Sequence, residues 1–359
     1  MNDLSNQTED FSDIRDAVRS LCQGYPGEYW REKDRKREYP TEFVQALTDS
    51  GFLAVLIPEI FGGSELGIQE AAAILEEIHK SGCNGAACHA QMYIMGTLLR
   101  HGSEEQKQKY LPGIASGELR LQAFGVTEPG SGTDTTSIRT FAKREGDEYV
   151  VNGQKVWTSR AEHSDLMLLL ARTTPKDEVT KRTDGLSVFL VDLRKSLNHG
   201  VTIRPISTMI NHATTEVFID DLRIPAEQRI GEEGKGFRYI LDGMNAERIL
   251  IGAECIGDPI AKAYAQSEAA DLMVRKAASL FDSGKPCGKE ANMAKLLAAD
   301  ASWEAADVCL QTHGGFGFAE EYDIERKFRE TRLYRIAPVS TNLILSYLAE
   351  HVLGLPRSF

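Results

Sequence analysis

The spacing of apolar residues changes twice along the chain, and this pattern constrains the fold more than any other feature of the sequence. In the first part, apolar residues recur every three or four positions, which is typical of helices. In the middle part they alternate with polar residues, which predicts strands, and the helical spacing then returns. The sequence therefore predicts an α+β protein with an α-helical domain at residues 1–120, a compact antiparallel β domain at 121–231 and a helical bundle at 232–359.

Length and composition exclude several classes of protein. With 359 residues, the chain has room for two or three domains and a sizeable core. Its formal net charge of −12 argues against non-specific nucleic-acid binding and against a basic membrane surface. The six cysteines are scattered without metal-site spacing, so we expect reduced thiols and no metal. The acidic, polar start and the lack of a long apolar run predict a cytoplasmic protein with no membrane span.

Two short runs within residues 121–160 suggest a surface that binds a flat ring system. The first, residues 127–134, places hydroxyl side chains, two glycines and a proline in a turn between apolar residues. The second ends in Trp157, Thr158 and Ser159, and we expect it to be one strand of a hairpin whose two-residue turn is Asn152-Gly153. Together the two runs predict a β platform that presents one indole and several hydroxyl groups.

Both runs, in this order and at this spacing, resemble the acyl-CoA dehydrogenase family, and the resemblance covers nearly the whole chain. It implies an N-terminal α-helical domain, a middle antiparallel β domain and a C-terminal four-helix bundle. It also implies FAD-dependent α,β-dehydrogenation of an acyl-CoA, with electrons passed to an electron-transfer flavoprotein. The oligomer implied is a homotetramer built as a dimer of dimers.

Residues that match the family's FAD contacts come from four places in the sequence. Ser159 stands where a threonine hydroxyl usually approaches flavin N5. The contacts implied are Phe124, Val126, Thr127, Gly132 and Thr133 on the first run, Trp157 and Ser159 on the second, Gln311, Gly314 and Gly315 from another subunit, and Ser340 and Asn342 toward the phosphates. Thr133 is also expected to contact the substrate.

Glu247 is the expected catalytic base. It lies on the apolar stripe of a predicted helix, where an unpartnered carboxylate is costly and its pKa should be raised by desolvation. In the isovaleryl- and long-chain-type members of the family, the base occupies this place on the helix, just before an arginine. Arg248 would then help to place the thioester or CoA. The alternatives are a structural ion pair between Glu247 and Arg248, or Glu254 as the base.

Pro338 stands where the commoner members of the family carry their catalytic glutamate. The absence of a carboxylate there agrees with its presence at residue 247. The family usually binds the thioester carbonyl with the backbone N–H at this position, and proline has none. One donor to that carbonyl is therefore missing or replaced.

A helix–loop segment of the family has no counterpart between Asp258 and Pro259. In relatives this segment reaches the flavin of a neighbouring subunit. We favour residues missing from the sequence at this point over a true deletion, because a shortened helix leaves apolar neighbours uncovered. The Cα atoms of these two residues are then expected to lie much farther apart than the roughly 3.8 Å of a peptide-bonded pair.

Two other functions remain open from the sequence. The first is a flavin oxidase on the same fold, acting on acyl-CoA or on nitroalkanes. The second is a flavin- or CoA-binding protein that has lost turnover, which Pro338 and the absent segment keep open. The acyl chain is not determined by the residues that the sequence places around the expected pocket.

Overall fold

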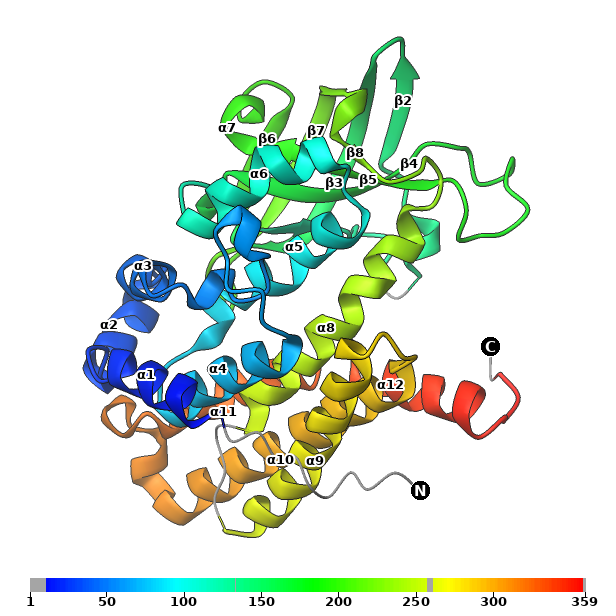
Figure 1. The fold of residues 1–359 in the computed structure, drawn as a ribbon. Helices are drawn as coiled ribbons and strands as arrows, with labels where there is room; N and C mark the ends of the chain where they lie inside the picture. Colours follow the sequence, from blue (N-terminus) through cyan, green and yellow to red (C-terminus); the bar gives the residue numbers. More distant parts are fainter. Residues whose placement is uncertain (1–10, 133, 257–260, 358–359) are drawn as a thin grey trace.

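The structure, a computed structural model, describes residues 11–132, 134–256 and 261–357. Figure 1 shows the sheet in one part of the molecule and the long C-terminal helices in another, with α8 running between them. The separation expected between Asp258 and Pro259 falls outside the described residues. In the described parts, no helix is both long enough and apolar enough to cross a membrane.

Six α-helices form the N-terminal part of the described chain. They are α1 (Ser12–Cys22), α2 (Gly27–Lys36), α3 (Thr41–Asp49), α4 (Ile68–Lys80), α5 (His89–His101) and α6 (Glu104–Ser116). Ser103 begins α6 with a reciprocal cap: Gln106 N–H donates to Ser103 Oγ at 3.2 Å, and Ser103 N–H donates to Gln106 Oε1 at 3.0 Å. The cap satisfies two backbone donors that the first helical turn leaves without partners.

The middle part forms one mixed sheet with the short helix α7 (Leu193–Ser196) beside it. Its strands are β1 (Leu121–Gly125), β2 (Phe141–Glu145), β3 (Glu148–Ser159), β4 (Leu166–Arg172), β5 (Leu186–Asp192), β6 (Val201–Pro205), β7 (Thr214–Pro225) and β8 (Arg229–Ile230). Their order is β6-β7-β3-β2-β4-β5-β8, and β1 pairs with β4. Most neighbours are antiparallel, as expected, while β1 and β2 each pair with β4 in parallel.

The expected hairpin turn at Asn152-Gly153 is wrong. Both residues lie inside the continuous strand β3, which pairs with β2 on one side and with β7 on the other. The register with β7 shifts between Val151 and Gly153, where Asp220 and Asp221 of β7 lie opposite Asn152, so the dipeptide continues the strand and the bulge lies on β7. A Cβ on Gly153 would lie 2.7 Å from the Thr140 Cα, and this close approach of two backbones requires glycine there.

Both faces of the sheet are covered. Along β4, Leu166, Leu168 and Leu170 belong to a large core shared with the helices, whereas Met167 and Leu169 belong to a second core on the opposite face. Alternation of side chains along a strand places successive residues on opposite faces, and here both faces are apolar. The sequence of β4 is therefore an almost continuous apolar run.

The C-terminal part contains α8 (Gly236–Ile256), α9 (Ala261–Asp282), α10 (Gly288–His313), α11 (Ile324–Tyr334) and α12 (Thr341–Tyr347). Helix α8 contacts α9 and α10, and also α4 and α5 of the N-terminal part. Its buried face includes Ile240, Glu247, Ile251 and Glu254. Two carboxylates are therefore enclosed where the N-terminal and C-terminal helices meet.

Candidate active site

The platform expected from the sequence lies where β1 and the turn after it meet the end of β3. Val156 N–H donates to Thr127 O at 2.9 Å and joins the two runs directly. The register of β3 with β7 shifts between Lys155 and Thr158, so Val156 and Trp157 bulge out of the ladder. A bulge turns side chains away from their regular direction. As a result, Trp157 is 59% exposed despite its size.

A buried ion pair holds the turn that follows β1. Lys155 Nζ lies 2.8 Å from Glu128 Oε1, and it also donates to Val126 O at 3.0 Å. Glu128 accepts two further hydrogen bonds, from Arg139 N–H at 2.6 Å and Thr140 N–H at 2.9 Å. Burial lowers the pKa of Lys155 to about 8, and Glu128 opposes this shift. Burial alone would raise the pKa of Glu128, but Lys155 and the hydrogen bonds lower it overall. The ion pair and these hydrogen bonds therefore hold the turn after β1 in place.

Ser159 completes the platform. Its Oγ accepts a hydrogen bond from Asn211 Nδ2 at 2.8 Å, which leaves the hydroxyl proton available to donate. Trp157 and Arg160, close to Ser159 on either side, both have left-handed backbone conformations with φ near 60°. Such conformations are uncommon outside glycine and persist only where surrounding contacts impose them.

Glu247 is enclosed, with 5% of its surface exposed. Burial raises the pKa of its carboxyl group to about 7, while a hydrogen bond with Tyr93 and the charges of Arg248 and Arg160 act in the opposite direction. Tyr93 comes from α5 and Arg160 from the end of β3, so the helices and the platform converge on this carboxyl group. The sequence correctly placed Glu247 on the buried face of its helix.

Arg248 does not form the structural ion pair with Glu247 that the sequence left open. Its Nη1 donates to Asn245 Oδ1 at 3.0 Å, and no carboxylate of the described chain lies within ion-pair distance. Its Nε is buried without a hydrogen-bond partner. Burial lowers the pKa of this guanidinium, and the charge of Glu247 partly restores it. Arg248 thus keeps one enclosed N–H group without a protein acceptor.

Glu254, the other buried carboxylate of α8, has a different environment. Its Oε1 lies 2.7 Å from His89 Nδ1, and Oε2 lies 3.8 Å from His79 Nε2. Glu254 is fully enclosed by these side chains and by Gly85, where a Cβ would lie 2.9 Å from Oε1. Glu254 therefore has two histidines within 4 Å of its carboxylate, whereas Glu247 has no ion-pair partner in the described chain.

The remaining expected contacts are scattered over the surface of the single chain. Ser340 caps α12 by accepting a hydrogen bond from Leu343 N–H at 3.4 Å. Pro338 is exposed, and the next residue's carbonyl, Val339 O, accepts from the buried Lys295 Nζ at 2.8 Å. Gln311, Gly314, Gly315, Asn342 and Gly132 are exposed, and Thr133 lies outside the described residues.

Sequence reasoning missed Arg160, Tyr93 and Asn211. Arg160 is the next residue after Ser159. A charged residue at the end of an apolar strand, next to the platform, could have indicated a role at the site. Tyr93 lies among the apolar residues of α5, so nothing in its spacing distinguished it. Asn211 reaches Ser159 only because β3 pairs with β7, which no local pattern shows.

Comparisons with known proteins match all three parts of the chain. Family models for acyl-CoA dehydrogenases match at residues 8–118 (N-terminal domain), 123–222 (middle domain) and 256–353 (C-terminal domain). An acyl-CoA dehydrogenase of Mycobacterium bovis is 32% identical over 98% of each chain. A caffeyl-CoA reductase-Etf complex subunit of Acetobacterium woodii is 30% identical over 91% of this chain and 94% of its own. The solved structure of butyryl-CoA dehydrogenase from Megasphaera elsdenii has a TM-score of 0.88 at 25% identity, covering 97% and 99% of the two chains.

The alignment with the Mycobacterium bovis relative bears on the segment expected between Asp258 and Pro259. It is 388 positions long, whereas the present chain has 359 residues, so that relative has positions with no counterpart here. Asp258 and Pro259 are consecutive in the amino-acid sequence. Because residues 257–260 are not described, the expectation that residues are missing between them stays a prediction.

Proposed function

The chain belongs to the acyl-CoA dehydrogenase family, and we propose that this oxidoreductase uses FAD to introduce an α,β double bond into an acyl-CoA thioester. The observation that carries the proposal is the enclosed carboxyl group of Glu247, whose pKa is raised to about 7. The test is anaerobic addition of straight, branched and cyclic acyl-CoAs to the flavin-loaded protein. Bleaching of the oxidised flavin together with 2-enoyl-CoA formation is expected, and no bleaching with any of them would contradict the proposal.

The platform fits a flat aromatic cofactor. The large Trp157 indole is mostly exposed, and burying such a ring against another ring is favourable. Thr127 and Ser159 add hydroxyl groups that hydrogen-bond without charge. We propose that Phe124, Val126, Thr127, Gly132, Thr133, Trp157 and Ser159 hold the flavin, with Gln311, Gly314 and Gly315 of another subunit and with Ser340 and Asn342. When bound, FAD supplies the two-electron acceptor that side chains lack.

Glu247 would remove the proton from the carbon next to the thioester. A base works best when its pKa is close to the operating pH, and burial brings this carboxyl group into that range. Tyr93 and the charges of Arg160 and Arg248 favour the ionised form of the carboxyl group. The enclosure also excludes water, which would otherwise compete for the carboxylate.

Arg248 is the proposed replacement for the backbone donor that Pro338 lacks. Its buried Nε–H has no acceptor in the described chain, and Glu247, the proposed base, is the next residue along α8. A positively charged donor to the thioester oxygen would stabilise the negative charge that develops there when the α-proton leaves. Arg248 would then contribute to substrate binding and to catalysis together.

The partner, assembly and location are proposals of the same kind. The name of the Acetobacterium woodii relative includes Etf, which supports an electron-transfer flavoprotein as the electron acceptor here. Exposure of Gln311, Gly314 and Gly315 is compatible with contact across a homotetramer. Cys22, Cys83, Cys88 and Cys287 are free thiols, which supports a cytoplasmic location.

Two alternatives have specific support in Pro338. Without the usual backbone donor, the protein would be an acyl-CoA or nitroalkane-type oxidase, or would have lost turnover altogether. Reoxidation of the reduced flavin by oxygen, compared with a dye acceptor, separates an oxidase from a dehydrogenase. A protein that binds flavin and acyl-CoA tightly but never bleaches would be a catalytically inactive binding protein.

A further inference from the structure

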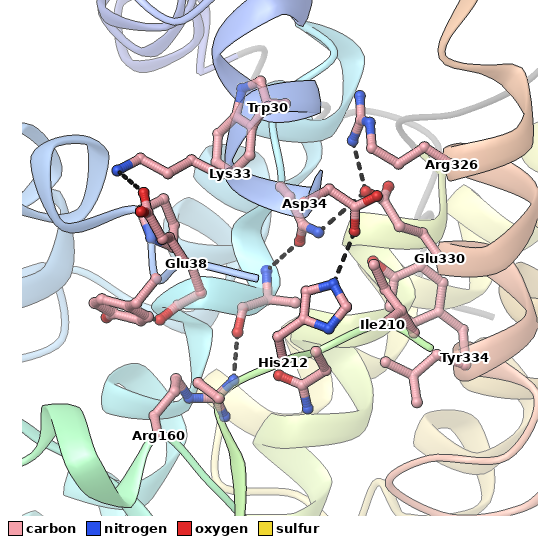
Figure 2. A pocket seen from close by; sticks show the side chains of 18 residues that line it. Trp30, Lys33, Asp34, Glu38, Arg160, Ile210, His212, Arg326, Glu330 and Tyr334 are labelled. Atoms are coloured by element: carbon pink, nitrogen blue, oxygen red, sulfur yellow. Dashed lines mark hydrogen bonds and ion pairs between the residues drawn. The ribbon is translucent and has the colours of Figure 1, made fainter. Parts of the chain in front are cut away.

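A cavity of about 90 Å³, lined by both charged and apolar side chains, adjoins the platform on the side of α2 and α11. Its walls include Asp34 from α2, Arg160 and His212 beside the sheet, and Tyr334 from α11. Figure 2 shows Arg160 at one end of the cavity and Trp30 and Arg326 at the other. A single water needs roughly 10–15 Å³ of such space, so the cavity has room for a small polar group and part of a chain.

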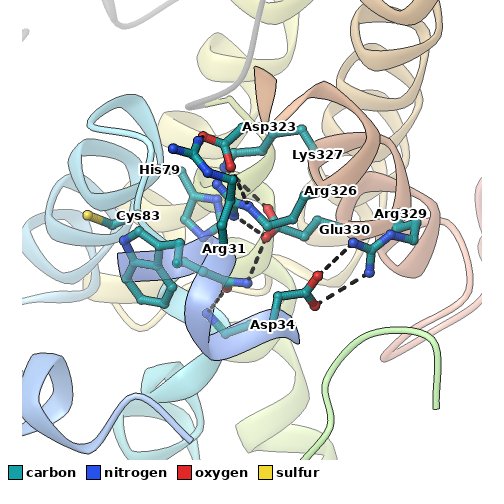
Figure 3. A network of polar contacts seen from close by, with 12 residues as sticks. Arg31, Asp34, His79, Cys83, Asp323, Arg326, Lys327, Arg329 and Glu330 are labelled. Atoms are coloured by element: carbon teal, nitrogen blue, oxygen red, sulfur yellow. Dashed lines mark hydrogen bonds and ion pairs between the residues drawn. The ribbon is translucent and has the colours of Figure 1, made fainter. Parts of the chain in front are cut away.

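The carboxylates around the cavity are already paired with cations. Asp34 accepts from Arg329 at 2.7 Å and lies 2.9 Å from His212 Nε2, and Glu330 lies 2.6 Å from Arg326. Figure 3 shows the contacts of Asp34 with Arg329 and of Glu330 with Arg326 between α2 and α11, and Figure 2 labels His212. Because each of these carboxylates has a positive neighbour, the wall offers little net negative charge to repel an anion.

Arg160 is the exception among these charges. Its guanidinium is buried, with 4% of the residue exposed, and no carboxylate of the described chain lies within ion-pair distance. One Nη donates to Ala86 O, and Nε has no hydrogen-bond partner. A buried cation without a counterion is costly, and an anion bound against it would remove much of that cost.

His212 offers a second buried nitrogen close to Arg160. Arg160 N–H donates to Ala213 O at 2.6 Å, so pairing between the ends of β3 and β7 holds residues 160 and 212 side by side. Asp34 occupies His212 Nε2, whereas Nδ1 is buried without a hydrogen-bond partner. Arg160 and His212, which come from neighbouring backbone segments, therefore line the same cavity.

The cavity also lies close to the proposed chemistry. Asn211, another wall residue, donates to Ser159 Oγ on the platform at 2.8 Å. Arg160 is close enough to Glu247 and Tyr93 to lower the pKa of both groups. An acyl group whose α-carbon meets Glu247 would thus have Arg160 and this cavity within reach of its far end.

We propose that the cavity binds a carboxylate at the distal end of the acyl group, so that the preferred substrates are mono-CoA thioesters of dicarboxylic acids. The proposal rests on the dehydrogenation proposed above. The carboxylate would pair with the Arg160 guanidinium beside His212, whose imidazole is held by Asp34. Arg160 would then act in substrate specificity.

The test compares pairs of acyl-CoAs of equal chain length, one member carrying a terminal carboxylate and the other a terminal methyl group. Flavin reduction is followed anaerobically in the flavin-loaded full chain. The expected half-saturating concentration is about ten- to a hundredfold lower for the dicarboxylic member, as for a hydrogen bond to a charged group. In Arg160→Met the ratio within each pair should fall to about one. Arg144→Met, an exposed arginine on β2, should retain the wild-type ratio.

Equal half-saturation of the two members by the wild type, or an unchanged ratio in Arg160→Met, would overturn the subsite. If Arg160→Met fails to fold or to hold flavin, the wild-type ratio decides alone. Should neither series reduce the flavin, the proposed dehydrogenation fails. Calorimetric titration of the protein with adipate then decides the subsite separately, with binding weakened in Arg160→Lys supporting it and no binding to the wild type overturning it.

Discussion

Glu254 Oε1 lies 2.7 Å from Nδ1 of His89, whereas Glu247, two turns earlier on the same face of α8, has no ion-pair partner in the described chain. The two buried carboxylates of this helix are thereby distinguished by their neighbours. Glu254 is held by a histidine and is suited to joining α8 to α5. Glu247 has a raised pKa and only weaker, more distant positive charges, which suits a proton acceptor.

Replacing Glu247 with glutamine should abolish most of the chemical step while leaving the fold intact. Glutamine keeps the size and the hydrogen bonding of the side chain but cannot accept the α-proton. We expect the rate of substrate-driven flavin bleaching to fall by about 10²–10⁴-fold, as is typical for loss of a general base. Stopped-flow absorbance measures the rate, and flavin content checks the fold. Asp242→Asn, on the exposed side of α8, is the matched control, and a comparable loss there would argue against a special role for Glu247.

The rate of flavin reduction should rise with pH around an apparent pKa of about 7. Glu247 must be ionised to act as a base, and burial keeps it protonated at lower pH. The stability effect has the opposite sign: because the folded pKa lies above the usual value of 4.5, the stabilising contribution of the bound proton is lost as the pH rises through about 7. Glu247→Gln should therefore gain stability relative to wild type above that pH. A reduction rate independent of pH across this range would contradict the assignment.

Lys155→Met should destabilise the protein strongly. It leaves Glu128 as a buried carboxylate without its ion-pair partner, which typically costs about 3–5 kcal/mol in the free energy of unfolding. Denaturant titration measures the loss, and flavin retention should weaken because the turn at Thr127 loses its anchor. Lys143→Met removes an exposed pair with Glu145 and should cost less than about 1 kcal/mol. Similar losses in the two variants would mean that the buried pair does not anchor the turn.

Gly153→Ala should lower stability by about 1–3 kcal/mol, as expected for overpacking. The added Cβ would meet the Thr140 backbone at 2.7 Å, so β3 or its neighbour must shift. Thermal denaturation of the variant is compared with Gly130→Ala, where a Cβ would meet nothing within 4 Å. Equal melting temperatures for Gly153→Ala and wild type would show that this part of β3 accommodates a side chain.

The flavin-loaded protein should be a homotetramer in solution. Gln311, Gly314 and Gly315 are exposed in the single chain and match positions that contact the flavin of a neighbouring subunit in the family. Light scattering coupled to size exclusion measures the mass, and the flavin-to-protein ratio is taken across the same peak. A monomer that retains its flavin would exclude a contribution from these residues across subunits.

The sequence by itself determined the features that depend on local spacing. Apolar periodicity predicted the α–β–α order, and Glu247 was anomalous because it interrupts an apolar helix face. These inferences succeed because a helix fixes which residues share a face, whatever the rest of the chain does.

Only the tertiary structure decided the features that depend on which strands become neighbours. Asn152-Gly153 is a favourable turn sequence, but β2 and β7 both pair with this segment, so β3 continues through it as a strand and the extra residue of the bulge lies on β7. The same pairing of β3 with β7 brings His212 beside Arg160, two residues far apart in the sequence. Strand pairing is set by the burial of whole faces and not by local propensity, so no window of sequence contains it.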